Sequence, residues 1–306
     1  MDQPTVQSFV KPRVMGFVLT ISALLIVSTN LLVGTALLKL LLKRGCQSWC
    51  FVLNLALADT LVGVAITGLG KTRCLLRMSF LTSPCMASIL TMFLISLDRY
   101  MAIKMPLRYS LMSGKWKTTG SLLAVWISSF TMGFLPVMVP QLQATAPYDG
   151  FCAFFNVTHD IAIIVLYCLL FFPVLSLFIY MYLDILKIAC IHHKQISQIR
   201  QTSSRHQLLR SWSHVKALRT VGVLIGCFLV LWSPFFVVCI VHLLCRECAL
   251  KEVLENYLWL LGLFNSLINP LVYACWQREV RLQLSDMFSC ITNRILFLLM
   301  LSPANI

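Results

Sequence analysis

Three residues of different chemistry stand side by side at the end of a long apolar run. Asp98, Arg99 and Tyr100, in the stretch SLDRYMAI, place a carboxylate, a guanidinium and a phenol at adjacent positions. An ionisable group beside a membrane-length apolar segment is costly and by default functional. In such a set the guanidinium of Arg99 can be neutralised locally or can reach a partner. The simpler alternative is an interfacial anchor that reaches the lipid headgroups, and this motif alone leaves both open.

A second set of polar residues lies inside the apolar segments. Asp59, in NLALAD, falls in the middle of one segment, and NSLINPLVY places Asn265, Asn269 and Tyr273 in another. A lone carboxylate in hydrocarbon needs partners, because otherwise it takes up a proton. Asp59 is therefore expected to have polar neighbours. Two alternatives remain open, a bound cation and a protonated carboxyl group that is hydrogen-bonded without an ion.

The elements that carry these residues are predicted to be membrane-spanning helices. The 306-residue chain is 59% hydrophobic and 12% charged, well below the roughly 25% charged of a soluble domain. Apolar runs of about 20 residues can cross the bilayer as helices. Seven such runs lie near residues 16–40, 51–70, 75–103, 118–139, 160–187, 217–244 and 253–275. The predicted fold class is an all-α membrane protein with a seven-transmembrane helix bundle.

The distribution of charge predicts the orientation of the bundle. Most of the 25 Lys and Arg residues fall at the connections 41–50, 104–117 and 184–216 and in the C-terminal tail. Basic segments favour the cytoplasmic side, so the N-terminus is expected outside the cell. The net charge of +14 therefore indicates topology and contact with membrane lipids, not nucleic-acid binding. In the long polar connection, Asp184, His192 and His193 are expected to be solvated and not to form a metal site.

These features divide the chain into three parts. Residues 1–15 are expected to be a short extracellular N-terminus, 16–276 the helix bundle, and 277–306 an amphipathic helix with a cytoplasmic tail. The stretch QREVRLQLSDMFSCI predicts that this helix is short and lies on the inner leaflet. Cys290 at its end is either palmitoylated or an unmodified thiol.

Further motifs complete a set in a fixed order. Asn30 lies on the first run, Trp126 on the fourth, and LWSPFF places Trp232 two residues before the helix-bending Pro234 on the sixth. With NLALAD, DRY and NSLINPLVY, these motifs resemble those of a rhodopsin-like G protein-coupled receptor across essentially the whole chain. The resemblance implies a plasma-membrane receptor, not an enzyme, that has a heterotrimeric G protein as its partner.

The resemblance also implies roles for the polar residues. The switch that meets the G protein would comprise Asp98, Arg99, Tyr100 and Tyr273. An allosteric sodium ion would lie in a pocket formed by Asp59, Ser88, Asn265, Ser266 and Asn269, and no other cofactor is expected.

The outer face carries expected covalent features. The resemblance implies a disulfide bond between Cys74 and Cys152. Cys245 and Cys248 could form a second bond, and the rival zinc site lacks a second cysteine pair. Asn156 begins an outward-facing sequon, for which glycosylation and an unmodified side chain are equally open.

Some residues depart from the family pattern. His214 stands where many relatives carry an acid that holds the Arg of the switch, so we expect appreciable ligand-independent signalling. Met181 stands where a tyrosine is expected, and either the adjacent Tyr182 replaces it or that contact is missing. Pro84 is expected to kink the third span.

The expected ligand is a lipid. Leu81 occupies the place of the Asp that binds cationic amines in related receptors, and Leu263 the place of the retinal lysine of opsins. Arg77 and Glu255 are expected near the mouth of the pocket. The expected lining is apolar and aromatic: Leu81, Thr82, Cys85, Met86, Phe154, Phe155, Trp232, Phe235, Phe236 and Trp259.

Several longer stretches indicate a particular group of receptors within this family. CFVLNLALADTLVGVAITGL, CAFF, YLWLLG and EVRLQL resemble a receptor for fatty-acid ethanolamides and lysophospholipids. This implies coupling to the stimulatory G protein and a rise in cyclic AMP. Asn256, where arginine is expected, puts the headgroup contact in doubt. The alternatives are a cannabinoid-like or lysophospholipid receptor, coupling to another G protein, or, on weaker grounds, a transporter.

Overall fold

Helices make up almost all of the described chain. The computed structural model describes residues 4–44, 47–64, 71–105, 107–109, 114–145, 152, 154–199, 205–245, 248 and 250–301, and describes only some of the side chains near the helix ends. The long helices are α1 (Pro4–Arg44), α2 (Gln47–Val64), α3 (Lys71–Lys104), α5 (Lys115–Met138), α7 (Asp160–Ile199), α8 (Arg205–Leu244), α10 (Trp259–Trp276) and α11 (Arg278–Leu301). Short helical segments are η1 (Pro140–Leu142), α6 (Phe154–Val157), α9 (Lys251–Val253) and the π-helical η2 (Leu254–Leu258).

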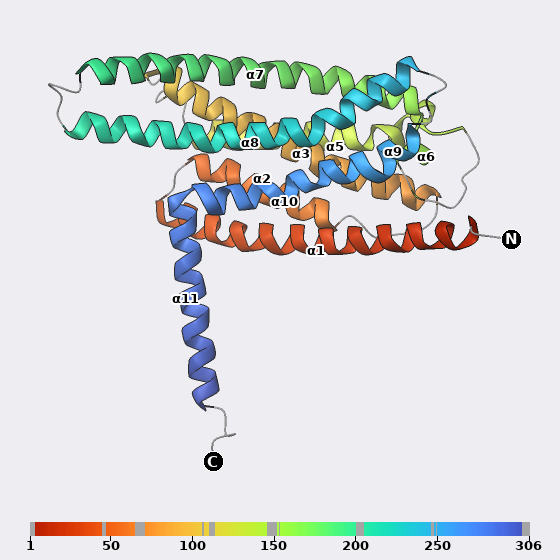
Figure 1. The fold of residues 1–306 in the computed structure, drawn as a ribbon, viewed down its shortest axis with the longest axis horizontal. Coiled ribbons are helices and arrows are strands. Elements are labelled where there is room, and N and C mark those ends of the chain that lie inside the picture. Colours follow the sequence, from red (N-terminus) through yellow and green to blue (C-terminus); the bar gives the residue numbers. More distant parts are fainter. Residues whose placement is uncertain are drawn as a thin grey trace.

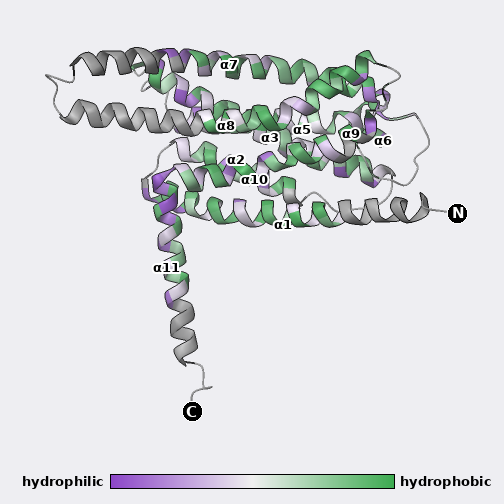
Figure 2. Cartoon of the chain, viewed as in Figure 1, coloured by the Kyte–Doolittle hydropathy of each residue, from purple (hydrophilic) through white to green (hydrophobic). Residues whose placement is uncertain are grey.

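Seven of these helices form one bundle. Figure 1 shows α1, α2, α3, α5, α7, α8 and α10 running along a common direction, whereas α11 runs across it. Within the described residues, six helices are long and apolar enough to cross a membrane, and α2 has a shorter apolar segment, Ser48–Val62. Hydrophobic residues line the middle of the bundle, and hydrophilic residues gather where α10 meets α11 (Figure 2). The predicted seven-helix fold is confirmed.

Several helix boundaries differ from the predictions, and α1 already begins at Pro4 instead of near residue 16. The connection expected over 184–216 is mostly helical, because α7 continues to Ile199 and α8 already begins at Arg205. Polar composition marks where a segment leaves the hydrocarbon, but backbone hydrogen bonds can continue in water. The helix after the bundle is also longer than predicted, since α11 extends to Leu301.

Buried amide side chains join neighbouring helices. The Asn30 Nδ2 on α1 donates to the Ser266 carbonyl oxygen on α10 at 2.8 Å. The Asn54 Nδ2 on α2 donates to Thr91 Oγ1 on α3 at 2.8 Å, and Trp126 Nε1 on α5 donates to Asn54 Oδ1 at 2.9 Å. Interhelical hydrogen bonds of this kind stabilise membrane bundles by roughly 0.6 kcal/mol each. They fix α2 and α3, which carry Asp59 and Asp98.

The closest approach between α3 and α5 is at a glycine. A Cβ built on Gly133 of α5 would lie 2.1 Å from Ser83 Oγ and 2.9 Å from the Ser83 backbone nitrogen. The neighbouring Pro84 lies inside α3, which continues through it. Gly133 therefore gives α5 the space to pack directly on the backbone of α3.

Candidate functional site

The carboxylate of Asp98 is held by three donors at one end of the bundle. Arg99 Nη2 pairs with Asp98 Oδ2 at 3.3 Å, and Ser48 Oγ on α2 donates to the same oxygen at 3.0 Å. Tyr109 donates its hydroxyl to Asp98 Oδ1 at 2.8 Å. Burial and the hydrogen bond to the Asp98 carboxylate raise the pKa of Tyr109 above its ordinary value. In this arrangement Arg99 is paired and not extended toward a partner, with 30% of its side chain exposed.

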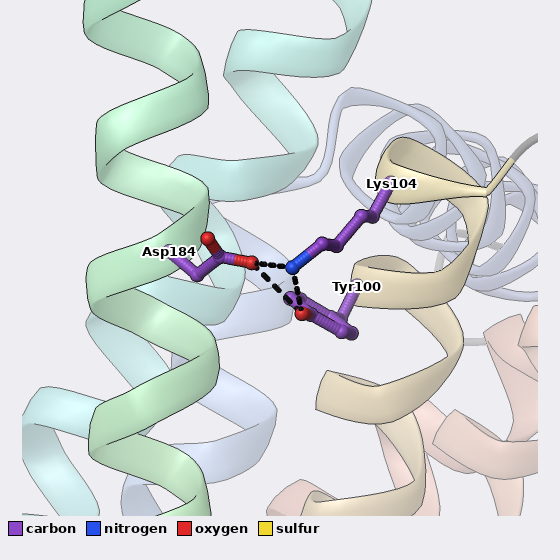
Figure 3. Close-up of polar contacts among 3 residues, drawn as sticks. All are labelled: Tyr100, Lys104 and Asp184. Atoms are coloured by element: carbon purple, nitrogen blue, oxygen red, sulfur yellow. Dashed lines mark hydrogen bonds and ion pairs between the residues drawn. The ribbon is translucent and has the colours of Figure 1, made fainter.

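Tyr100 belongs to a separate polar cluster between α3 and α7. Its hydroxyl donates to Asp184 Oδ2 at 2.8 Å and accepts from Lys104 Nζ at 2.7 Å. Lys104 also forms a direct ion pair with Asp184 (Figure 3). The prediction that Asp184 is simply solvated is therefore wrong. Its partner lies 80 residues away on another helix, a pairing that the local sequence does not show.

At the position of α7 where a tyrosine was expected, Met181 and the adjacent Tyr182 have different surroundings. Met181 is buried in the core, whereas the neighbouring Tyr182 is half-buried. A Cβ built on Gly222 of α8 would lie 2.9 Å from Tyr182 Cε2. Tyr182 thus packs against α8 at a position that only glycine leaves open. The side chain of His214 lies outside the described residues.

The buried Asp59 has the polar neighbours that the sequence predicts. Ser266 Oγ donates to Asp59 Oδ1 at 2.7 Å, and Asn269 Nδ2 donates to Asp59 Oδ2 at 2.9 Å. Asn265 is also buried, and its Nδ2 lies 3.8 Å from the sulfur of Met92. Two buried amide oxygens of α10, Asn265 Oδ1 and Asn269 Oδ1, have no hydrogen-bond partner within the described structure. Ser88 of α3 is also buried and interacts with the Asp59 carboxylate.

This chemistry suits a small hard cation. A carboxylate with additional hydroxyl and amide oxygens is the donor set that such ions prefer. The unpartnered oxygens are acceptors for which a cation or water would supply the missing interaction. The Tyr273 hydroxyl, on the same helix as Asn269, is likewise buried without a hydrogen-bond partner in the described structure, so it does not join the Asp98 cluster here.

The expected ligand residues of α8 and α10 meet in an aromatic cluster. Trp232 packs edge-on against Phe235 and Trp259, with ring centroids 6.2 and 6.4 Å apart. The ring of Phe154, from α6, stacks on Trp259 at 6.1 Å and 9° between planes. Phe236 stacks on Phe171 of α7 at 3.7 Å. Four helices thus contribute to one apolar wall.

The α3 residues of the expected pocket face the same region. Leu81 and Cys85 are buried in a cluster against which Phe154 and Trp259 pack. Met86 packs, partly buried, against the larger core cluster, which includes Phe155. Thr82 is buried with its hydroxyl bonded to its own helix, on the Met78 carbonyl oxygen at 2.7 Å. Arg77 is half-buried on α3, and the side chain of Glu255 lies outside the described residues.

One polar residue of this region was not predicted. Tyr167 of α7 lies with its ring 6.1 Å from that of Phe154, and its hydroxyl is buried without a hydrogen-bond partner in the described structure. Buried phenols usually find a partner. The sequence offered one signal for this residue, a tyrosine within an apolar run six residues before Pro173. An apolar helix alone does not show which face it turns inward.

The outer loops are tied down covalently and by an ion pair. Disulfide bonds join Cys74 to Cys152 and Cys245 to Cys248. Lys251 Nζ donates to the Phe155 carbonyl oxygen at 3.0 Å and lies 3.9 Å from Asp160 Oδ2. These contacts fix the segment that carries Phe154. Asn156 is half-buried in α6, and its glycosylation stays a prediction.

Comparisons with known proteins agree with this arrangement. Residues 29–273 match the family described as 7 transmembrane receptor (rhodopsin family). The chain is 46% identical to the human glucose-dependent insulinotropic receptor, over 95% of this chain and 91% of that protein. It is 45% identical to the rat receptor of that name, over 89% of this chain and 61% of that protein. The canine histamine H2 receptor is 29% identical, over 89% of this chain and 79% of its own length. The chain therefore belongs to the rhodopsin family of seven-transmembrane receptors.

Proposed function

We propose that this receptor binds a lipid amide or a lysophospholipid and, through the stimulatory G protein, raises cyclic AMP. The observation that carries the ligand class is the apolar character of the α3 and α10 residues that pack with Phe154, together with the α8 aromatic rings that pack on Trp259. Leu81 is only 4% exposed within this region. A long acyl chain gains about 0.8 kcal/mol for each CH₂ that it buries against such side chains.

An amine ligand is disfavoured despite the similarity to a histamine receptor. A cationic ligand needs a carboxylate partner in a low-dielectric site, because an unpaired buried charge is costly. Leu81 stands at the position where amine receptors of this family carry that carboxylate. The similarity at 29% identity therefore supports the family but not an amine ligand.

Similarity to the glucose-dependent insulinotropic receptor supports the finer part of the proposal. The stretches CFVLNLALADTLVGVAITGL, CAFF, YLWLLG and EVRLQL carry that resemblance, together with 46% identity over most of both chains. Coupling to the stimulatory G protein rests on this resemblance alone. Arg99 would leave Asp98 on activation and contact the G protein.

Tyr167 would give the apolar region a polar contact. Its buried hydroxyl lies close to Phe154 and has no partner within the described structure. An amide or ester carbonyl of a bound lipid can accept a hydrogen bond from such a phenol. We include Tyr167 among the ligand-binding residues for this reason.

Two regulatory features belong to the same proposal. A sodium ion held by Asp59 and the oxygens around it would stabilise the conformation in which these side chains converge. The replacement of the usual acid by His214 would leave the switch less firmly held. We therefore propose measurable signalling without ligand.

A binding experiment tests the ligand class directly. Purified receptor in lipid nanodiscs should bind radiolabelled oleoylethanolamide saturably, and oleoyl lysophosphatidylcholine should compete. Trp259→Ala removes the ring on which Phe154 stacks and should weaken binding at least tenfold. Trp116→Ala is the matched control, since this tryptophan is 90% exposed at the far end of α5. Absence of saturable binding, or equal effects of the two variants, would contradict the proposed ligand site.

A further inference from the structure

The inner ends of α3 and α7 are joined by a three-residue bridge. Tyr100 and Lys104 are one helical turn apart on α3, so their side chains lie on the same face. Both reach Asp184 of α7, Tyr100 through its hydroxyl at 2.8 Å and Lys104 through a direct ion pair (Figure 3). Lys104 Nζ also lies 5.2 Å from the centroid of the Tyr100 ring. The hydroxyl, the ammonium and the carboxylate thus satisfy one another.

This bridge is separate from the pair formed by Arg99. Arg99 contacts Asp98, whose carboxylate also accepts from Ser48 and Tyr109. The adjacent Tyr100 instead faces α7. One turn of α3 is therefore tied to α2 and the 107–109 segment through Asp98 and to α7 through Tyr100. The structure holds the paired Arg99 and the bridge at the same time.

Helix α7 in turn packs against α8. The Tyr182 ring fills the space left by Gly222, where a Cβ would lie 3.3 Å from the tyrosine hydroxyl. One turn away on α7, Phe178 is fully buried and lies 5.5 Å, centroid to centroid, from Phe228 of α8. A displacement of the inner end of α7 would therefore disturb its contacts with both α3 and α8.

We propose that Lys104 and Asp184 are positioning residues for G protein activation. By clamping α7 to α3, they stabilise the arrangement in which Arg99 is paired with Asp98. An interaction that exists in one state and is lost in another shifts the population toward the first. Loss of the bridge therefore releases Arg99 more often and raises agonist-independent signalling.

The size of the effect follows from the exposure of the pair. The side chains of Lys104 and Asp184 are 37% and 21% exposed, so solvent weakens their attraction. Partly exposed ion pairs of this kind shift an equilibrium by roughly two- to fivefold. The clamp thus adjusts the balance of states without locking it.

The test measures nucleotide exchange without any lipid agonist. Wild type and variants are reconstituted in nanodiscs at equal amounts, with a panel of purified heterotrimers that represents each Gα class. Lys104→Gln and Asp184→Asn each break the ion pair and should raise exchange about two- to fivefold. The combination of Lys104→Asp with Asp184→Lys should return it toward wild type, because the Tyr100 hydroxyl can donate and accept in either direction. Lys187 also acts electrostatically on Asp184, so the combination is tested with and without Lys187→Gln.

Two variants serve as controls, and a third is a further test of the bridge. Lys104→Arg keeps the charge and should behave as wild type. Lys117→Gln removes an exposed cation from the start of α5, at the same end of the bundle, and should leave exchange unchanged. Tyr100→Phe keeps both charges but loses the central hydroxyl, and it should give a smaller increase that tests the bridge independently of charge.

The outcomes separate this inference from the proposed ligand and transducer. Because no lipid agonist is added and every Gα class is present, the wild type and the variants can still be compared if the proposed ligand or the proposed G protein is wrong. Exchange equal to or below wild type in both single variants would overturn the inference. A charge-swapped chain that stays as active as the single variants would also overturn it, since the charges would then act outside the bridge.

Discussion

Tyr167 places a single polar group inside an apolar region of the bundle. The Tyr167 hydroxyl is buried beside the Phe154 ring without a hydrogen-bond partner in the described structure. If it donates to a lipid carbonyl, its removal costs one neutral hydrogen bond, about 0.5–1.5 kcal/mol. Tyr167→Phe should therefore raise the half-maximal concentration of oleoylethanolamide about two- to tenfold at unchanged surface expression.

The control for this prediction is another tyrosine near the outer end. Tyr257 is 55% exposed on η2, so Tyr257→Phe should not change potency. Concentration–response curves for both variants and for wild type provide the comparison. Equal potency of Tyr167→Phe and wild type would show that the hydroxyl does not contact the ligand.

Asp59 gives a second test at the residue scale. A sodium ion bound only by the folded protein stabilises it according to its concentration relative to its Kd. Replacing sodium chloride by choline chloride should therefore lower the melting temperature of the purified receptor by a few degrees. Asp59→Asn removes the charge but keeps acceptor and donor atoms for Ser266 and Asn269, and it should abolish this difference. A wild-type melting temperature that does not depend on sodium would contradict the proposed ion.

At the scale of elements, contact between α3 and α5 depends on one missing methyl group. A Cβ on Gly133 would come within 3.0 Å of backbone atoms of Ser83, which cannot move as a side-chain end can. Gly133→Ala should therefore force the helices apart and destabilise the receptor by about 1–3 kcal/mol. In detergent, the Gly133→Ala variant should therefore melt at a lower temperature than wild type.

The same helix provides the matched control. Nothing lies within 4 Å of a Cβ on Gly120, which is also in α5. Because alanine favours a helix over glycine by about 1 kcal/mol, Gly120→Ala should be neutral or stabilising. If both variants melt at the same temperature, close packing at Gly133 does not limit stability.

Across the whole molecule, apolar length and ordered motifs predicted the architecture but not all contacts. The seven spans, the receptor family, the absence of enzymatic function and the multi-pass plasma-membrane location are confirmed by family membership. The N-terminus is extracellular and the C-terminus cytoplasmic, as in that family. That Asp59 has polar partners was predictable because a buried carboxylate must be satisfied, whereas the choice of Ser266 and Asn269 followed from the resemblance to the family.

Contacts between distant segments were less accessible to sequence reasoning. The pairing of Lys104 with Asp184 depends on how α7 is placed beside α3, and hydropathy carries no such information. Likewise, hydropathy predicted that one span ends near residue 187 and that the next begins near residue 217. In the structure, α7 continues to Ile199 and α8 already begins at Arg205. The position of Tyr182 on Gly222 required the structure, because both flanking segments are apolar.

The most direct test of the account is cyclic AMP in cells that express this receptor or its Arg99→Ala variant. We expect a rise over mock-transfected cells without ligand, a further rise with oleoylethanolamide, and loss of both in Arg99→Ala. Arg73→Ala, an exposed arginine at the other end of α3, should keep the basal rise. A flat response of wild type at normal surface expression would contradict both the lipid ligand and the stimulatory G protein.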